Sequence, residues 1–469
     1  MMLKKCSLTL LIAGLLTGCS LAPKYERPDA PIESQYPTGH SEAPSAANKI
    51  GWHEFFHDER LKALIAAAIE NNRDLRIAAL RIEEARAMYD IQWADRLPTI
   101  DIDGSSTRTR TLNGTEMVTS GTHQVGLGIT AFELDFFGRV KSLTEAALDN
   151  YLATEEAQRS AYLSLVSEVA KTYLTERAQA EQIELAEKSY RSYQNSLDLM
   201  RKRYDVGASS AIEIRQYETL LHSAKVTLTT LQRQHEQTIN ALVVLVGGKM
   251  PADLPEAHQL SESDLMMNIP EGMPSELLEN RPDIRQKEQQ LKAANANIGA
   301  ARAAFFPRFS LTAFAGTISP TFSSLFDAHS GAWTWQPQMT VPIFDSGRNL
   351  ANLDVAEARK NIAVAEYEKS IQVAFREVAD ALVARNWLNE QVKAQEGVLT
   401  AEADRYRLAQ ARFNNGIAGS LEVLDAQRQQ FAAEQSLVDA RLLRMINAVE
   451  LYRALGGGLY QPDSVKLNP

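Results

Sequence analysis

The chain has 469 residues, of which 45% are hydrophobic and 23% are charged. This balance excludes an intrinsically disordered polymer and leaves enough apolar material for a sizeable folded core. The formal net charge of -10 argues against nucleic acid as a partner, because a polyanion would be repelled.

The amino-terminal segment resembles a secretory signal peptide. Two lysines precede an apolar run too short to span a bilayer, and the segment ends at Leu16-Thr17-Gly18-Cys19, a pattern typical of a bacterial lipobox. We predict that residues 1–18 are removed and that Cys19 becomes the lipidated amino terminus, anchored in outer-membrane lipid. Ser20 next to it favours sorting to the outer membrane. The alternative is an ordinary cleavage site beside a chance cysteine.

Beyond the signal, two halves of the chain match each other without a gap at a constant separation of 209 residues. The matched pairs include Asp74 with Asp283, Pro98 with Pro307, Gly138 with Gly347, Arg203 with Arg412, Gly207 with Gly416, Glu213 with Glu422, and Gly247 with Gly456. We therefore divide the mature chain into a lipidated linker (19–60), a first repeat (61–268), a second repeat (269–458) and a carboxy-terminal tail (459–469).

Each repeat contains a long segment without proline. A proline in a helix interior destabilises the helix by about 3 kcal/mol relative to alanine. We predict a helix over about 139–205, which would extend roughly 100 Å at 1.5 Å per residue. Gly207 then turns the chain into an antiparallel return helix, and a second such hairpin turns at Gly416. Heptad spacing predicts coiled-coil packing along two sets of residues: Leu424, Phe431, Val438, Met445 and Tyr452, and Ala351, Val355, Ala358, Ile362 and Ala365.

The caps of the return helices also follow from the sequence. Ser210 and Glu213 have the spacing of a capping box at the start of the first return helix. Gly419 takes the cap position in the second repeat.

Segments with a period of two residues lie within about 98–135 and 307–344, and such alternation predicts strands with one apolar face. The alternating apolar residues are Val125, Leu127, Ile129 and Ala131; Phe309, Leu311, Ala313 and Ala315; and Trp333, Trp335, Met339, Val341 and Ile343. We expect the apolar face to meet lipid and the polar face to line a lumen, with Trp333 and Trp335 at the membrane interface.

Four strands would leave two open edges in lipid, so several chains must share one barrel. Three chains give twelve strands and a usable channel, which favours a trimer. The alternative is a pair of soluble hairpins.

Several strings carry a resemblance to a known family. They are Trp52 with Phe55-Phe56, Asp58 and Leu61; Phe132-Glu133-Leu134-Asp135-Phe136-Phe137-Gly138-Arg139; Asn280-Arg281-Pro282-Asp283-Ile284; Ala300-Ala301-Arg302-Ala303-Ala304-Phe305-Phe306-Pro307; and Leu424-Asp425-Ala426-Gln427-Arg428. Together with the lipobox, they resemble the lipoprotein branch of the TolC-like outer-membrane efflux family. The resemblance implies an α+β membrane protein: a homotrimer with a shared twelve-stranded outer-membrane β-barrel and a periplasmic α-helical barrel. It also implies docking on a periplasmic adaptor and an inner-membrane pump of the resistance-nodulation-division class.

The family resemblance places the gate of the duct at the periplasmic hairpin tip, which here is the turn around Gly416. Glu422 and Asp425 follow it three residues apart, on one helical face. A threefold assembly would gather these acids in a ring that attracts cations, with Arg428 as a partner and Leu421 as an apolar constriction. The alternative is that both acids are solvated side chains of a first helical turn.

Two strings suggest chemistry that we set aside. His53-Glu54-Phe55-Phe56-His57 spells a zinc-protease motif, but it lies in the linker, and Phe55 with Phe56 are better explained by packing on the following helix. Met266-Met267 is an isolated pair without a repeating pattern. We predict no metal, no cofactor besides the lipid, and no enzyme activity. A duct for protein secretion and a surface-anchored structural coiled coil remain alternative functions.

Overall fold

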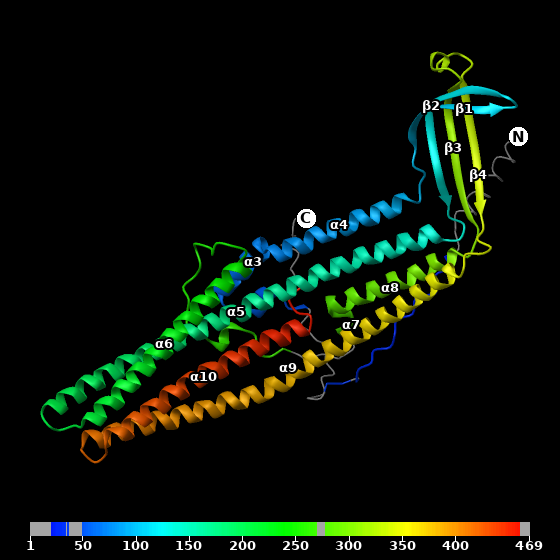
Figure 1. Ribbon diagram of the computed structural model, residues 1–469. Helices are drawn as coiled ribbons and strands as arrows, with labels where there is room; N and C mark the ends of the chain where they lie inside the picture. Colours follow the sequence, from blue (N-terminus) through cyan, green and yellow to red (C-terminus); the bar gives the residue numbers. More distant parts are fainter. Residues whose placement is uncertain (1–19, 34, 37–48, 270–276, 460–469) are drawn as a thin grey trace. The chain divides into compact units, whose positions relative to one another are not determined.

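The computed structural model describes residues 20–33, 35–36, 49–269 and 277–459. Figure 1 shows their helices and strands, which follow in the order α2(Trp52–Phe55), α3(Glu59–Asn71), α4(Arg73–Ala94), β1(Asp101–Asn113), β2(Glu116–Leu134), α5(Arg139–Asp205), α6(Ala211–Val246), η2(Glu262–Asp264), α7(Leu277–Asn280), α8(Pro282–Ala303), β3(Arg308–Ser319), η4(Phe322–Ser324), β4(Gly331–Thr340), α9(Arg348–Asn414) and α10(Ser420–Ala454). The predicted signal peptide, Cys19 and all but the first residue of the predicted tail lie outside the described residues.

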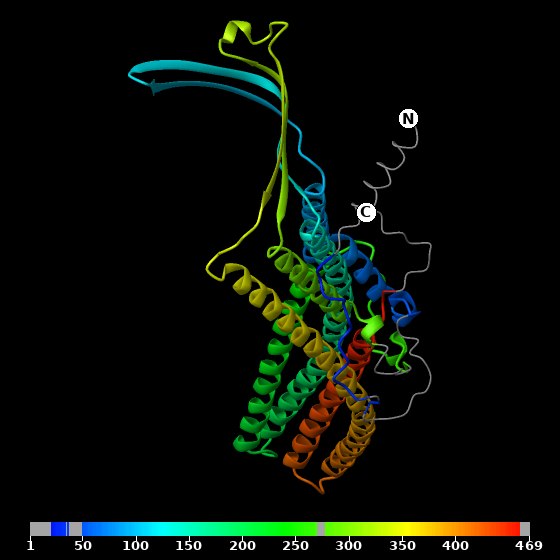
Figure 2. The same cartoon turned by 90° about the vertical axis from the view of Figure 1, so that its right-hand side faces the viewer.

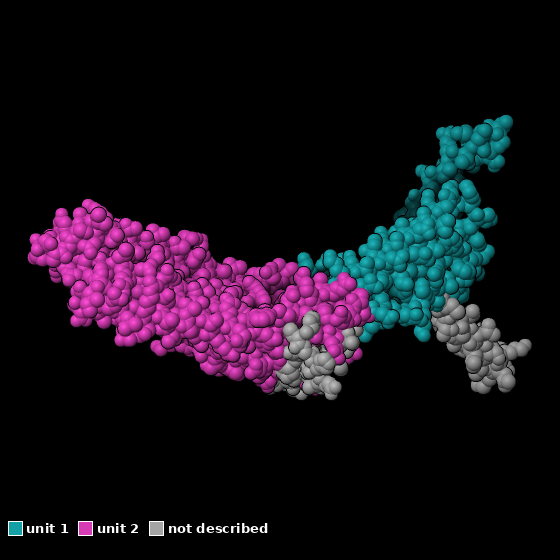
Figure 3. Space-filling view, turned by 90° about the horizontal axis from the view of Figure 1, so that it is seen from below, with its two compact units in different colours: residues 1–29, 80–156, 285–369 teal, residues 30–79, 157–284, 370–469 magenta. Residues whose placement is uncertain are grey.

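The described chain forms two compact units, which are coloured in Figure 3. Unit 1 contains the described residues up to 29 together with 80–156 and 285–369, and it includes all four strands. Unit 2 contains the described residues of 30–79, 157–284 and 370–469, and it includes both helical turns. Each unit therefore draws on both sequence repeats.

The four strands of unit 1 form one antiparallel sheet in the order β1-β2-β3-β4. Residues paired across an antiparallel sheet project from the same face. Leu127 pairs with Ile102 on one side and Ala315 on the other, and Ala315 pairs with Trp333. The predicted apolar face is therefore continuous across all four strands. The opposite face carries mostly polar residues and glycines, among them Asp101, Asp103, Gln124, Ser310, Thr312, Gln336 and Gln338.

The alternation predicted for β2 fails at Ala131. The register with β3 shifts between Ile129 and Phe132, and Ala131 has a positive φ of 52°. Such a bulge inserts an extra residue, so the side chain of the residue after the bulge points to the apolar face. Phe132, paired with Leu311, continues the apolar face in place of Ala131.

The predicted fourth strand is also too long. β4 ends at Thr340, so Val341 and Ile343 lie outside it. Thr340 pairs with Arg308, the first residue of β3, so β3 offers no residue for Val341 to pair with.

The long helices match their predicted positions. α5 spans 67 residues from Arg139 to Asp205, and α9 spans 67 residues from Arg348 to Asn414. Gly207 and Gly416 turn the chain with φ of 75° and 70°, a left-handed conformation that glycine adopts without steric cost.

The predicted caps are also present. The capping box at the start of α6 forms as predicted, because Ser210 and Glu213 exchange side-chain and backbone hydrogen bonds. Gly419 is the N-cap of α10, although it provides no side-chain cap bond.

The aromatic residues of the linker are buried in unit 2. Phe55 stacks on Tyr452 of α10 with ring centroids 4.0 Å apart, and the Trp52 indole N–H donates to the Tyr162 hydroxyl at 2.9 Å. Phe55 therefore packs on α10, a contact that the sequence did not predict, and its packing on the following helix stays a prediction. α2 ends at Phe55, and Phe56 forms a bridge with Leu265, so the two histidines of the zinc-protease string do not share a helix.

The two predicted seams have different environments. The α10 set is largely buried, with Leu424, Val438, Met445 and Tyr452 each 3% exposed or less. The α9 set is exposed along its whole length, from Ala351 to Ala365. An exposed apolar seam with heptad spacing is typical of a surface that meets another helix. Among the described helices, none is long and apolar enough to cross a membrane.

Candidate functional site

The predicted gate residues lie at the start of α10, beside the turn between α9 and α10. Figure 1 and Figure 2 both show this turn next to the turn between α5 and α6, within unit 2. Beneath the tips, α5, α6 and α10 share a small apolar core of Leu197, Met200, Tyr217 and Leu424. This core holds the two hairpin ends together through side chains from three helices.

The acids of the predicted gate are paired with arginines. Arg428 donates to Asp425 at 2.8 Å, which is the pairing that the sequence spacing predicts. Asp425 also accepts from Arg405 of α9, and Glu422 pairs with Arg412 of α9 at 3.3 Å. The hydrogen bond from Arg405 is the foremost cause that holds the pKa of the Asp425 carboxyl below its usual range. The acids are therefore compensated within one chain.

The sequence did not predict Arg405 and Arg412 as partners of these acids. Both belong to α9, and they face α10 because an antiparallel hairpin brings together residues at similar distances on either side of its turn. Arg412 lies four residues before Gly416 and Glu422 six residues after it, so the two side chains meet across the turn. Leu421 is 62% exposed, and its repeat equivalent Ile212 is 72% exposed, so both tips present an apolar side chain to solvent in the single chain.

The two hairpin tips are also joined by polar contacts at Glu213. Its Oε1 accepts from the Ser420 hydroxyl at 2.7 Å, while its Oε2 accepts from the Ser209 hydroxyl and from the Ser210 backbone N–H, both at 2.8 Å. The Ser210 N–H is the largest of the contributions that lower the pKa of Glu213 to about 2. Only the capping contact with Ser210 was predicted, since the bond to Ser420 links the two repeats.

Comparison with known proteins identifies the family of this chain. A family model described as outer membrane efflux protein matches residues 64–248 and 273–457. The chain belongs to the outer membrane efflux protein family. The two matched segments begin and end 209 residues apart, which is the offset of the internal repeat.

Curated relatives of this efflux protein extend over nearly the whole chain. It is 45% identical over 459 residues to the probable efflux pump outer membrane protein TtgC of Pseudomonas putida, covering 96% of this chain and 94% of the relative. It is 43% identical over 452 residues to the cation efflux system protein CusC of Escherichia coli, covering 95% and 98%.

Solved structures share the fold. The open state of the Neisseria gonorrhoeae MtrE outer membrane channel superimposes with a TM-score of 0.87 at 38% identity, over 94% of this chain and 99% of that chain. A membrane protein from Pseudomonas aeruginosa superimposes with a TM-score of 0.88 at 42% identity, over 93% and 100%.

In unit 1 of this efflux protein, Trp333 and Trp335 lie on the apolar face of the sheet. They pair with Ala315 and Ala313 of β3, and they are 78% and 63% exposed. Trp333 is the third residue of β4 and so lies close to the loop that joins β3 to β4. Their placement at a membrane interface stays a prediction, because such a role depends on the surrounding lipid.

Proposed function

We propose that this protein is the outer-membrane exit duct of a tripartite efflux pump that exports drugs or other small toxic molecules from a Gram-negative cell. It performs no catalysis. The observation that carries the proposal is the division of the sheet into a continuous apolar face and a polar face, in a member of a family of outer membrane efflux proteins. An apolar face suits lipid and a polar face suits an aqueous lumen.

The working assembly is a trimer. Among the described residues, β1 and β4 form the two edges of the sheet, so each has one side without a partner strand. Three copies joined edge to edge close one barrel of twelve strands, wide enough for a channel. The exposed α9 seam supports the same assembly, because Val355 and Ile362 are 47% and 59% exposed and need a neighbouring helix.

The remaining partners follow from this role. The duct extends into the periplasm and docks on a periplasmic adaptor, which connects it to an inner-membrane pump of the resistance-nodulation-division class. A covalent lipid on Cys19 anchors each copy in outer-membrane lipid. Residues Leu421, Glu422, Asp425 and Arg428 form the periplasmic gate, where threefold symmetry gathers the paired acids into a ring.

Deleting the gene tests the proposal. We expect the deletion strain to become several-fold more sensitive to drugs, dyes and toxic ions, while it secretes large proteins at the normal rate. A plasmid that carries the wild-type gene restores resistance. Defective protein secretion with normal drug resistance would instead identify a duct for protein secretion. No change in either property would favour the alternative of a surface-anchored structural coiled coil.

A further inference from the structure

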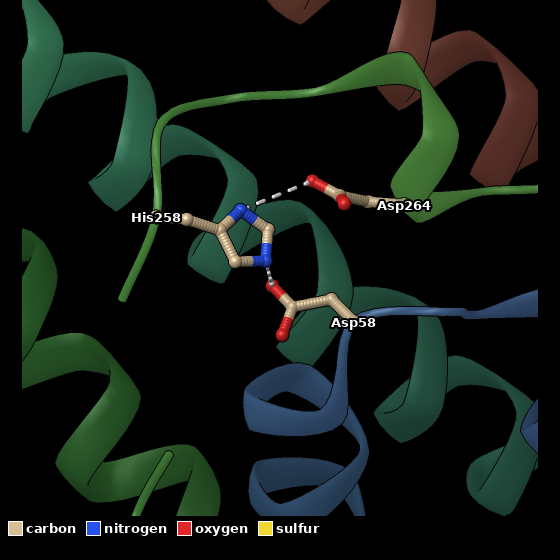
Figure 4. Close-up of side chains that lie close together, drawn as sticks. All are labelled: Asp58, His258 and Asp264. Atoms are coloured by element: carbon tan, nitrogen blue, oxygen red, sulfur yellow. Dashed lines mark ion pairs between the residues drawn. The ribbon is translucent and has the colours of Figure 1, made fainter. Parts of the chain in front are cut away.

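Asp58, His258 and Asp264 form a cluster in unit 2 that lies outside the gate and outside the sheet. Asp58 is the N-cap of α3, whereas His258 and Asp264 belong to the segment between α6 and α7. Figure 4 shows the His258 imidazole between the two carboxylates. The Nε2 atom lies 3.7 Å from Asp58 Oδ2, and the Nδ1 atom lies 3.8 Å from Asp264 Oδ2.

We propose that these three side chains bind one divalent transition-metal cation, with Zn²⁺ as the reference ion. One imidazole nitrogen and two carboxylate oxygens are a ligand set that suits zinc better than calcium or magnesium, which prefer oxygen ligands alone. One ligand atom from each side chain lies within 4.8 Å of the others. Water would complete the coordination shell.

Asp58 is held in place by three hydrogen-bond donors. Its side chain is 3% exposed, and Oδ1 accepts hydrogen bonds from the backbone N–H groups of Arg60 at 2.7 Å and Leu61 at 3.2 Å. Tyr173 donates to Oδ2 at 2.6 Å. These three donors orient the Asp58 carboxyl group, and a second lone pair of Oδ2 remains for a cation on the side of His258.

Asp264 is fixed relative to Asp58 by the backbone around it. Its Oδ2 accepts from the Ser261 N–H at 3.2 Å in the capping box of η2. The His57 N–H donates to the Asp264 carbonyl at 2.7 Å, and the Met266 N–H donates to the Phe55 carbonyl at 3.0 Å. These bonds attach η2 to the chain just before Asp58, so the two carboxylates cannot separate without breaking backbone pairing.

His258 has the arrangement of a metal ligand. Its Nδ1 lies 3.1 Å from the backbone carbonyl of Gln259, and donation of the Nδ1 proton there leaves the lone pair on Nε2, which faces Asp58. Metal-binding histidines are commonly oriented by such a bond from the second nitrogen. The side chain is 52% exposed, so ions and water can reach it.

Distances and charge are compatible with zinc. Two ligands of one ion lie at most about 4.4 Å apart, because zinc bonds to nitrogen and oxygen are about 2.0–2.2 Å long. The separation of 3.7 Å between Nε2 and Asp58 Oδ2 satisfies this limit, whereas Asp264 faces Nδ1 and must move toward Nε2 to bind the same ion. Within the described residues, His258 is the one side chain that forms an ion pair with either carboxylate. The Arg177 guanidinium acts on Asp58 and on His258 from beyond ion-pair distance, so a divalent cation would add positive charge beside carboxylates that one imidazole alone pairs directly.

Zinc binding to the purified full-length protein tests the proposal. Tag-free protein in detergent is titrated with Zn²⁺ by calorimetry, and we expect one zinc ion per chain. His258→Ala and Asp264→Asn should each weaken this binding roughly tenfold or more, because each removes one ligand. Asp58 is left unchanged, since its loss would also remove the cap of α3. His222→Ala is the matched control and should bind zinc like the wild type, because this exposed histidine lies on α6, away from the cluster.

Zinc should also slow hydrogen exchange in residues 249–268 of the wild type and not of His258→Ala. The absence of measurable zinc binding, or zinc binding that both cluster variants retain, would overturn the proposal. It would show that the imidazole merely bridges the carboxylates as a protonated cation. Neither measurement depends on transport, so the outcome is independent of the proposed duct function.

Discussion

The Ser420 hydroxyl donates a hydrogen bond of 2.7 Å to Glu213 Oε1, and this bond joins the hairpin tips of the two repeats. Ser420 is 3% exposed and is the first residue of α10, while Glu213 is in the first turn of α6. At the position equivalent to Glu213, the second repeat has Glu422, which pairs instead with Arg412 of its own hairpin. Glu422 therefore stabilises its own hairpin, whereas the equivalent Glu213 connects the first hairpin to the second.

Removing this connection should loosen the tip. Ser420→Ala leaves the capping contacts of Glu213 intact but removes its bond to the second hairpin. We expect a higher single-channel conductance or a larger open fraction in planar bilayers.

Ser209→Ala is the matched control for this experiment. Ser209 donates to the same carboxylate at 2.8 Å from within the first hairpin, so its loss should leave the conductance near that of the wild type. Equal conductance in Ser420→Ala and the wild type would show that the bond does not restrain the tip.

The ionisation of Glu213 predicts a pH dependence. Its pKa is lowered from 4.5 to about 2, so its contribution to stability is complete above pH 4.5 and is lost as the pH falls through about 2. Thermal unfolding of the wild type and Glu213→Gln should therefore differ by a constant amount above about pH 5 and converge near pH 2. A difference that changes between pH 6 and pH 8 would contradict this assignment.

The acids beside Gly416 should control ion selectivity. Replacing Glu422 and Asp425 together by Ala leaves Arg405, Arg412 and Arg428 without these partners, so the tip becomes basic. We expect reversal potentials in a salt gradient to show a reduced preference for cations.

Asp404→Ala is the control for the acidic pair. Asp404 pairs with Arg407 at 2.7 Å on the same hairpin, so its replacement changes charge without touching the predicted gate. If Glu422→Ala with Asp425→Ala leaves conductance and selectivity unchanged, these acids do not form the gate.

The tryptophans of β4 should contact lipid. Brominated lipids quench the fluorescence of tryptophan in a bilayer, so quenching of the wild type should fall strongly when Trp333 and Trp335 are both replaced by Phe. Trp387→Phe serves as the control, because Trp387 lies on α9 and is 71% exposed. Undiminished quenching in the double variant would place both residues outside the membrane.

The sequence predicted the helices and the sheet faces because these depend on local rules. The lack of proline defined α5 and α9, and period-two alternation defined the face that carries Leu127 and Trp333. The alternation failed at Ala131 because it cannot locate an inserted residue. It failed at Val341 because the apolar pattern continues past Thr340, the residue that pairs with the first residue of β3.

The candidate site was only partly accessible from the sequence. Arg428 was predicted to pair with Asp425 because both lie on one turn of α10. Arg405 and Ser420 form their contacts across hairpins, which requires knowledge of how the helices are placed. The cluster of Asp58 and His258 was missed for the same reason, since 200 residues separate them and the sequence predicted no metal.

The central claim is that three copies of this chain share one duct. Native mass spectrometry of the protein extracted in mild detergent tests it most directly. Our account predicts one dominant species with the mass of three mature, lipid-bearing chains. A stable single chain as the dominant species would contradict it.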